Sequence, residues 1–293
     1  MPFMVRATQA TGATPLTEAV GAVRRYYDRN TRLFRALGPG ARARAIRRAV
    51  WDAGVTSLDG ALEQVNALIV REVPVDTGAT RHGLHVLDLG CGVGGSLAYL
   101  AHALPQATLA GVTISAHQAR QARRAVQRWR AIVVEGDFHA LPFAARFTVA
   151  LAVEAFAHSP DPQRCYAEAA TILAPGGRLI VCDDFIAREP AHADERRWLE
   201  AFRAGWRVAG LQTTAQATAI AGQAGLALRT DRDLTGCLRL HTLPSPLNAM
   251  IRQVTDIAGR AHPFLHSLHG SLALQECLAR GLVHYRLLVF ERW

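Results

Sequence analysis

The middle of the chain carries the clearest pattern of hydrophobic and polar positions. Over residues 81–190, short runs of apolar and β-branched residues alternate with stretches of helical periodicity. This alternation predicts parallel strands joined by crossover helices. The expected strands lie at residues 85–89, 108–113, 131–134, 147–153 and 178–184.

The two ends of the chain are expected to be mainly helical. Residues 1–80 predict a helical cap, with helices at 17–37, 42–51 and 58–71. Residues 191–293 predict the second half of the core together with a helical lid. The elements expected there are helices at 195–209 and 214–224, a strand at 226–230, a helical stretch at 246–280 interrupted near Pro263 and Gly270, and a last strand at 282–291.

Seven strands in this order predict an α/β fold that makes one structural domain overall. Residues 81–190 would form the Rossmann-like core of a seven-stranded, doubly wound sheet. The N-terminal residues add a helical cap, and residues 238–281 form a helical insertion before the last strand. We expect this insertion to shape specificity.

The amino-acid composition excludes several classes of protein. The chain has 293 residues, of which 50% are hydrophobic and 19% charged, so it is not mainly disordered. It contains no lysine, because all 33 basic residues are arginine. This excludes chemistry that needs a Schiff-base, pyridoxal-phosphate or P-loop lysine. The five cysteines form no CxxC pair, which argues against a disulfide framework or zinc knuckle.

The formal charge of +9 raises the question of an anionic partner. The arginines cluster at residues 42–48 and 120–130, within helical patterns, and solvated helix faces are the favoured interpretation. No apolar run approaches the ~18 residues that span a bilayer, and the N-terminus lacks a signal-peptide core. We therefore expect a cytoplasmic protein that has no nucleic-acid partner and does not insert stably into a membrane. The sequence leaves open whether the chain forms a homodimer.

A glycine-rich turn follows the first expected strand. Gly90, Gly92 and Gly95 fit the GxGxxG spacing, in which glycines let the backbone approach a ligand at a helix N-terminus. That spacing alone is a weak signal. A nicotinamide site would place an acid at the end of the second strand, but Thr113 stands there. The pattern thus argues against a dinucleotide enzyme.

Three ordered motifs carry a resemblance to a known family. They are DLGCGVGG at 88–95, EGDF at 135–138 followed by LPF, and LAPGGRL at 173–179. Over about residues 81–186 the chain resembles the class I S-adenosylmethionine-dependent methyltransferases. The resemblance implies their Rossmann-like fold and S-adenosyl-L-methionine as cofactor, with S-adenosyl-L-homocysteine as product.

The same resemblance implies a cofactor site. Asp88 would order the loop and the ammonium end of the cofactor, and Asp137 would accept from the adenine amino group. Thr113 and Gln118 replace the usual acid at the ribose, since a hydroxyl and an amide both donate and accept. The implied contacts are Asp88, Gly90, Gly92, Thr113, Gln118, Asp137, Phe138 and Val153.

Further segments narrow the branch. The GVTIS…Q pattern at 111–118 and the stretch at 152–161 are similar to carbon-methylating enzymes, particularly sterol C-methyltransferases. A Tyr-Tyr-Asp segment at 26–28 is similar to one in that branch and in isoprenyl-diphosphate C-methyltransferases. The match beyond residue 190 is weak. The resemblance therefore implies a lipophilic isoprenoid or terpenoid alkene of secondary metabolism as substrate, with coupled cyclisation as a further option.

The expected chemistry needs alignment, cation stabilisation and a base. A nucleophile must lie in line with the methyl group at ~3–3.5 Å. If an alkene attacks, a carbocation remains, which aromatic faces stabilise until a base removes a proton. Glu154 follows the fourth strand and corresponds to the acid of the carbon-methylating relatives, and His158 lies four residues on. With Tyr26 and Tyr27 of the closing N-terminal helix, they are the candidate catalytic residues.

Each candidate also has a plainer interpretation. Glu154 could bind the ammonium group of the cofactor, His158 could order its loop, and the tyrosines could pack without chemistry. For Asp183 and Asp184, a loop or capping role is favoured over contact with substrate. For the whole protein the alternatives are an O- or N-methyltransferase of a natural product, a non-catalytic binding protein and a nucleic-acid methyltransferase.

A metal site is not expected. His262, His266 and His269 share one helical face, but a pocket-lining or surface face is the favoured interpretation. We expect Mg²⁺ to bind only if the substrate is a diphosphate, because this ion prefers carboxylate and phosphate oxygens.

Overall fold

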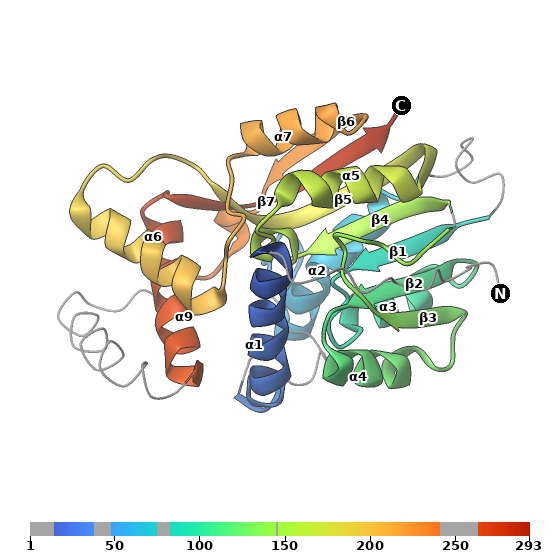
Figure 1. Cartoon of the computed structure of the whole chain (residues 1–293), viewed down its shortest axis with the longest axis horizontal. Helices are drawn as coiled ribbons and strands as arrows, with labels where there is room; N and C mark the ends of the chain where they lie inside the picture. Colours follow the sequence, from blue (N-terminus) through green and yellow to red (C-terminus); the bar gives the residue numbers. More distant parts are fainter. Residues whose placement is uncertain (1–14, 38–47, 75–82, 145, 241–262) are drawn as a thin grey trace.

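The computed structural model describes residues 15–37, 48–74, 83–144, 146–240 and 263–293. Its centre is a seven-stranded sheet with the order β3-β2-β1-β4-β5-β7-β6 (Figure 1). The first five strands pair in parallel, and β7 runs antiparallel to both of its neighbours. The strands are β1 His85–Leu89, β2 Thr108–Thr113, β3 Ala131–Glu135, β4 Phe147–Val153, β5 Leu173–Ile186, β6 Leu226–Asp233 and β7 Val283–Arg292. The predicted fold class is confirmed.

The central strands are buried on both faces, which explains their nearly continuous apolar runs. All six residues of β2 are buried, as are six of the seven residues of β4. One face packs against α2 Leu58–Arg71, α3 Gly95–Ala103 and α4 Ala116–Val126. The other face packs against α5 Pro162–Ile172 and α7 Thr214–Gln223. This two-sided covering is what a parallel sheet with crossover helices requires.

Two further helices lie beyond the end of the sheet. They are α6 Ala193–Trp206 and α9 Pro263–Ala279, at the left of Figure 1. They enclose a third apolar cluster that includes Trp198, Phe202 and Leu274. Their backbones meet at Gly205 and Gly270, where a Cβ added to Gly205 would lie 2.5 Å from the Cα of Gly270. Only glycine at both positions permits this crossing.

The N-terminal helix α1, Pro15–Leu37, lies between α9 and α4 (Figure 1). Its Asp28 accepts a hydrogen bond from the hydroxyl of Ser115 at 2.5 Å, at the start of α4. On its other side, the Tyr26 hydroxyl donates to Oγ of Ser267 in α9 at 3.0 Å. This helix therefore connects the core of the sheet with the C-terminal helices.

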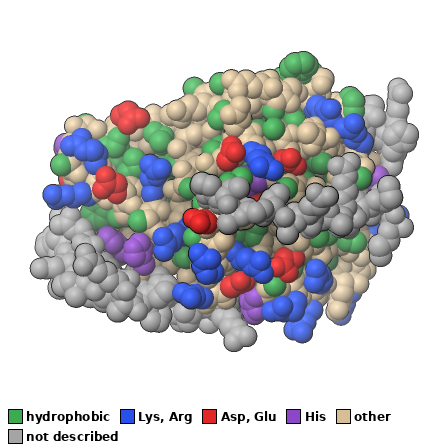
Figure 2. Space-filling view, viewed as in Figure 1, with side chains coloured by type: hydrophobic (Ala, Val, Ile, Leu, Met, Phe, Trp, Pro, Cys, Tyr) green, Lys and Arg blue, Asp and Glu red, His purple; other side chains and the backbone are tan. Residues whose placement is uncertain are grey.

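The described surface carries charged side chains of both signs. On the face shown in Figure 2, basic and acidic side chains of the described residues are interspersed. Pairs such as Arg286 with Asp231, 2.7 Å apart, neutralise charge locally. Within the described part of the chain, no helix combines the length and apolarity needed to cross a bilayer.

Two sequence-based expectations about helices need correction. The helix expected at 42–51 is not continued by its described residues 48–51, and Val50 instead forms an isolated bridge with Leu238. The interruption expected near Gly270 is absent, because α9 runs through this position and Gly270 packs against α6. Residues 42–47 and 246–262 of the expected helices lie outside the described residues.

Helix α6 also ends earlier than the expected residue 209. Its last residue is Trp206, because Arg207 adopts the left-handed conformation with φ +56°. Strand β6 is longer than expected because it pairs with β7 as far as Asp233, and β5 extends back to Leu173 beside β4 and on to Ile186 beside β7. The end of α6 is a local cap, in which the Arg207 backbone N–H donates to the carbonyls of Arg203 and Ala204, whereas the longer strands follow from pairing with distant segments.

The α6–α9 crossing makes the first testable prediction. Gly205→Ala should lower the free energy of unfolding by about 1–3 kcal/mol, because the added methyl group overpacks the contact between backbones. Gly222→Ala is the matched control, since a Cβ there meets nothing within 4 Å. That control should gain roughly 0.5–1 kcal/mol from the better helix propensity of alanine. Urea denaturation measures both, and equal stability of the two variants would contradict the close crossing.

Candidate active site

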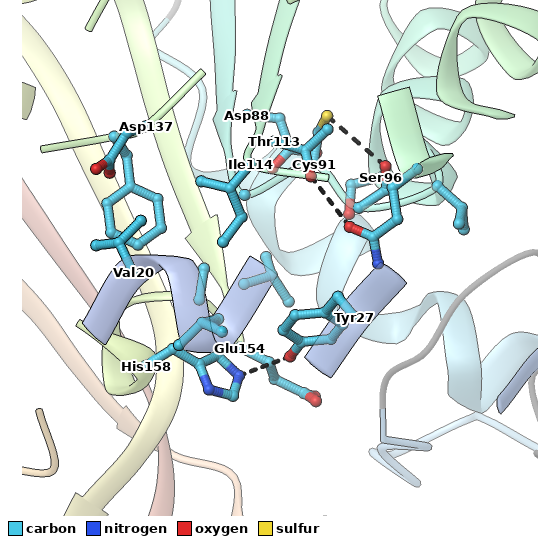
Figure 3. A pocket seen from close by; sticks show the side chains of 18 of the residues that line it. Val20, Tyr27, Asp88, Cys91, Ser96, Thr113, Ile114, Asp137, Glu154 and His158 are labelled. Carbon is cyan, nitrogen blue, oxygen red and sulfur yellow. Dashed lines mark hydrogen bonds between the residues drawn. The ribbon is translucent and has the colours of Figure 1, made fainter. Parts of the chain in front are cut away.

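A cavity opens at the carboxyl ends of β1, β2 and β4, which is where open parallel sheets bind ligands (Figure 3). Together with its mouth it encloses about 1010 Å³. Every predicted site residue except Tyr26 lines it. The predicted residues that the structure brings together here are Tyr27, Asp88, Gly90, Gly92, Thr113, Gln118, Asp137, Phe138, Val153, Glu154 and His158.

The glycine turn forms one wall of the cavity. Gly90 and Cys91 both donate their backbone N–H to the carbonyl of Val112 at 2.9 Å. Gly90 has φ +86°, and a Cβ at this residue would lie 2.8 Å from the Cβ of Ala155. The turn then leads into α3, whose first residues, Gly95 and Ser96, also face the cavity. A ligand can therefore approach backbone N–H groups closely at a helix N-terminus.

The expected ribose groups are already linked to each other. The Thr113 hydroxyl donates to Oε1 of Gln118 at 3.0 Å. The Gln118 amide in turn donates to the Thr31 hydroxyl of α1 at 3.1 Å. Thr31 is therefore part of this site, although sequence reasoning did not single it out. Thr31 lies one helical turn after Tyr27, and this spacing could have indicated that it faces the same site.

At the opposite end, Asp137 is fixed by its own turn. Its Oδ1 accepts from the backbone N–H of His139 at 2.9 Å and lies 2.6 Å from Nδ1 of the same residue. The other ring nitrogen of His139 lies 2.6 Å from the hydroxyl of Ser159. Phe138 packs against Phe156, with ring centroids 5.6 Å apart. A carboxylate beside an aromatic face is thus in place before any ligand binds.

Helix α1 closes the cavity with a single face. Val20, Val23 and Tyr27 have the spacing of one helical stripe, and all three line the cavity. Tyr26 is rotated by about 100° from Tyr27 along the helix, so its side chain points to α9 instead. Burial raises the pKa of Tyr26 to about 12. The structure does not bring Tyr26 into the cavity together with Tyr27, because Tyr26 packs outside it against α9.

Tyr27 and His158 form a hydrogen-bonded pair, drawn as a dashed line in Figure 3. The Tyr27 hydroxyl lies 2.7 Å from Nε2 of His158, and Nδ1 of His158 lies 3.3 Å from the carbonyl of Arg207. A carbonyl only accepts, so Nδ1 carries the proton and Nε2 accepts from Tyr27. Burial lowers the pKa of His158 and raises the pKa of Tyr27 well above its usual value. The pair is therefore neutral at pH 7.

Glu154 lies where β4 ends, and its backbone is strained. Its φ of +49° is in the left-handed region, which costs about 1–2 kcal/mol in a residue other than glycine. The backbone N–H of Glu154 donates to the carbonyl of Cys182 at 2.8 Å. Carboxylate atom Oε1 accepts from the backbone N–H of Arg48 at 3.1 Å and from the Tyr285 hydroxyl at 3.0 Å.

Two adjacent carboxylates of β5 lie beside this turn. Asp183 accepts from the backbone N–H groups of Ala155 and Ala157 at 3.1 and 3.0 Å, the loop-ordering role that the sequence favoured. Asp184 makes a bidentate pair with Arg48, at 2.6 and 2.5 Å. Burial, followed by the charge of Asp184, raises the pKa of Asp183 to about 7.

Arg48 and Tyr285 are the residues that sequence reasoning missed at this end. Arg48 belongs to the arginine cluster interpreted as a solvated helix face, yet its side chain is only 20% exposed. Tyr285 belongs to the terminal strand, where it looked like an ordinary core residue. Among the described residues, no group of three side chains is arranged to hold a metal ion. His266 and His269 belong to α9, while His262 lies outside the described residues.

Known proteins match this fold and this domain. Residues 87–181 match the family described as a methyltransferase domain. The 24-methylenesterol C-methyltransferase 2 of Oryza sativa subsp. japonica is 31% identical over 186 residues, covering 61% of this chain and 51% of the relative. The O-methyltransferase cnsE of Penicillium expansum is 36% identical over 126 residues, covering 41% of this chain and 45% of the relative.

One solved structure is similar over nearly the whole chain. It is geranyl diphosphate C-methyltransferase from Streptomyces coelicolor A3(2), in complex with Mg²⁺, geranyl diphosphate and S-adenosyl-L-homocysteine. It has a TM-score of 0.71 and 18% identity, and the match covers 97% of this chain and 100% of that chain. At this level of identity the likeness shows the fold.

Residues 87–181 thus carry a methyltransferase domain, and the chain has the fold of the solved methyltransferase structure that it matches. Among methyltransferases the chain resembles the sterol and isoprenoid C-methyltransferase branch, as the sequence motifs predicted. The chain spans about half the length of the curated relatives it matches.

The raised pKa of Asp183 predicts a pH dependence of stability. Its pKa is about 7 in the folded chain against an ordinary 3.8, so between pH 4 and 7 the folded state holds a proton that the unfolded state has released. The contribution of Asp183 to stability should therefore decrease as the pH rises through this window, by up to about 1.4 kcal/mol per pH unit. Comparing denaturation curves of the wild type and Asp183→Asn at several pH values measures it. A pH-independent difference between the two proteins would contradict the assignment.

Proposed function

We propose that this chain transfers the methyl group of S-adenosyl-L-methionine to a lipophilic small molecule. The preferred reaction is C-methylation of an isoprenoid or terpenoid alkene in secondary metabolism. The observation that carries the proposal is the composition of one cavity. Its glycine turn and Asp137 fit the cofactor, and Glu154 lies in the same cavity beside the Tyr27–His158 pair.

The residues present fit the cofactor. Gly90 lacks the Cβ that would fill the wall, and the α3 N-terminus offers backbone donors. Asp88, Asp137 and Glu154 line the cavity as acids, which suits a ligand with a sulfonium and an ammonium group. When bound, S-adenosyl-L-methionine supplies an electrophilic methyl group. Asp137 would accept from the adenine amino group through the oxygen that His139 does not occupy.

The acceptor end fits the chemistry of an alkene. Attack through an alkene carbon leaves a carbocation, which Glu154 would stabilise by charge and Tyr27 by its aromatic face. Glu154 would then accept the proton that is lost when the new alkene forms. Helix α1 covers the cavity and excludes water, which would otherwise trap the cation. The proposal includes a further step, in which the same cation cyclises within the cavity.

A second candidate rests on a different observation. The Tyr27–His158 pair could accept a proton from a hydroxyl or amine of the acceptor, as O- or N-methylation requires. The similarity to a fungal O-methyltransferase supports this alternative. Mg²⁺ would be required only by a diphosphate acceptor, whose phosphate oxygens would supply ligands.

The cofactor site predicts the effect of an Asp137 variant. Asp137→Asn should weaken binding of S-adenosyl-L-homocysteine by roughly 10- to 100-fold, because a hydrogen bond to a charged group is worth about 1.5–3 kcal/mol. Isothermal titration calorimetry measures the affinity. The control is Asp59→Asn, which removes an exposed acid of α2 and should leave the affinity unchanged. Equal affinities of the two variants would show that Asp137 does not contact the adenine.

The acceptor site predicts the effect of a Glu154 variant. Methyl-deuterated cofactor is supplied with prenyl diphosphates, sterols, terpenoid alkenes, phenols and amines, and products are analysed by mass spectrometry. An alkene acceptor should gain the label, and Glu154→Gln should reduce product by roughly 100-fold or more through loss of the base. Binding of S-adenosyl-L-homocysteine should stay within about twofold.

Two outcomes would decide against the preferred reaction. Label found only on phenols or amines, and lost in Tyr27→Phe, would favour the O- or N-methylation candidate. A Glu154→Gln variant that loses cofactor affinity in step with activity would assign Glu154 to the ammonium group of the cofactor instead.

A further inference from the structure

Two residues from distant parts of the chain converge on a single oxygen of Glu154. The backbone N–H of Arg48 comes from the segment before α2, and the Tyr285 hydroxyl comes from β7. Both donate to Oε1, at 3.1 and 3.0 Å. Since an ionised carboxylate only accepts, two donors on one oxygen fix the rotation of the whole group. The strained backbone of Glu154 indicates that this orientation is held at a cost.

Arg48 is itself held from two sides. Its guanidinium makes the bidentate pair with Asp184, and it lies over the ring of Tyr285 at 4.6 Å from the centroid. This fork geometry holds the guanidinium in place, and it thereby ties the segment whose backbone N–H donates to Glu154 to strand β5. These contacts therefore form one connected network, which consists of Arg48, Asp184, Tyr285 and Glu154.

Tyr285 is suited to act only as a donor. Its side chain is fully buried, and burial, followed by the charges around Cys182 and Glu154, raises the pKa of Tyr285 well above its usual value. The phenol therefore keeps its proton throughout the working pH range. Its ring cannot move without displacing both Arg48 and the core around β7.

We propose that Tyr285 and Arg48 are positioning residues for Glu154, holding Oε1 so that the carboxylate keeps one orientation toward the acceptor. Asp184 anchors Arg48 for this purpose. The inference rests on the role given to Glu154 under Proposed function, and it adds the residues that make this role possible. Tyr285 and Arg48 act through Glu154 and do not themselves touch the reacting atoms.

The first measurement does not depend on an acceptor. In protein labelled with ¹³C-glutamate, the infrared carboxylate stretch of Glu154 is assigned as the band that disappears in Glu154→Gln. Tyr285→Phe removes one hydrogen bond to this carboxylate and should shift the band. The matched control is Tyr166→Phe, because Tyr166 is an equally buried tyrosine whose hydroxyl has no hydrogen-bond partner among the described residues. The control should leave the band in place.

The second measurement tests whether Tyr285 acts through Glu154. With the acceptor that gains most label in the mass-spectrometric assay, Tyr285→Phe should lower the single-turnover rate about tenfold, the equivalent of ~1.4 kcal/mol. The affinity for S-adenosyl-L-homocysteine should not change. In the Glu154→Gln background, Tyr285→Phe should cause no further loss, because the group that it orients is gone.

Arg48→Lys provides an independent variant if Tyr285→Phe folds poorly. Lysine keeps the positive charge but cannot form the two-pronged pair with Asp184. We expect the same loss of rate in the wild-type background and none in Glu154→Gln. Thermal unfolding of all variants, with Tyr166→Phe for comparison, identifies a loss that is only structural.

Each outcome decides the inference. An unmoved Glu154 band in Tyr285→Phe overturns it, as does a loss of rate that persists in the Glu154→Gln background. If the band moves but Glu154→Gln turns over at the wild-type rate, the role of Glu154 under Proposed function is wrong and the network orients a group that the reaction does not use. If no acceptor in the panel reacts, the infrared result alone decides whether the hydroxyl holds the carboxylate.

Discussion

The adjacent aspartates at the end of β5 are the constraint on which the candidate site depends. Successive side chains of a strand point to opposite faces, so Asp183 and Asp184 hold different parts of the structure. Asp183 binds the backbone of the turn that carries Glu154 and His158. Asp184 binds Arg48 and thereby attaches the N-terminal segment to the sheet. Burial, followed by repulsion from the neighbouring Asp184 carboxylate, raises the pKa of Asp183 and makes its charged form costly. Arg48 offsets part of this cost.

The fold was predictable where local pattern and long-range packing agree. The strands at 85–89, 108–113 and 147–153 were predicted with the observed bounds, because strands covered on both faces read as apolar runs between turn residues. Gly270 was misjudged because glycine weakens a helix locally, while the close approach of α6 that requires it is invisible in sequence. Residues 48–51 look helical by periodicity, but their partners are Glu154, Asp184 and Leu238, all far along the chain.

The site shows the same division between local and distant information. The residues around the glycine turn and Asp137 belong to contiguous motifs, so the resemblance that those motifs carry implied that they meet at the edge of the sheet. Tyr26 and Tyr27 could not be separated by residue type, since only the rotation of the helix decides which one faces the cavity. Arg48 and Tyr285 lie 106 and 131 positions from Glu154, and no local motif connects them to it. The contribution of Tyr285 follows from the topology that places β7 beside β5, and that of Arg48 from its ion pair with Asp184.

The two ends of the cavity differ in how their polar groups are restrained, and this difference bears on the chemistry. Around Thr113, Gln118 and Thr31 the hydrogen bonds join neutral side chains, which can exchange partners when a ligand's hydroxyls arrive. Around Glu154 the carboxylate accepts from the buried Tyr285 hydroxyl and from the Arg48 backbone N–H, and the neighbouring Tyr27–His158 pair is neutral. A half-buried carboxylate that is held in one orientation exerts its charge with less solvent screening than one in open water. That setting stabilises positive charge that develops in the cavity more than positive charge already solvated outside it. An acceptor that becomes cationic on methylation would gain from this difference, whereas one that stays neutral would not.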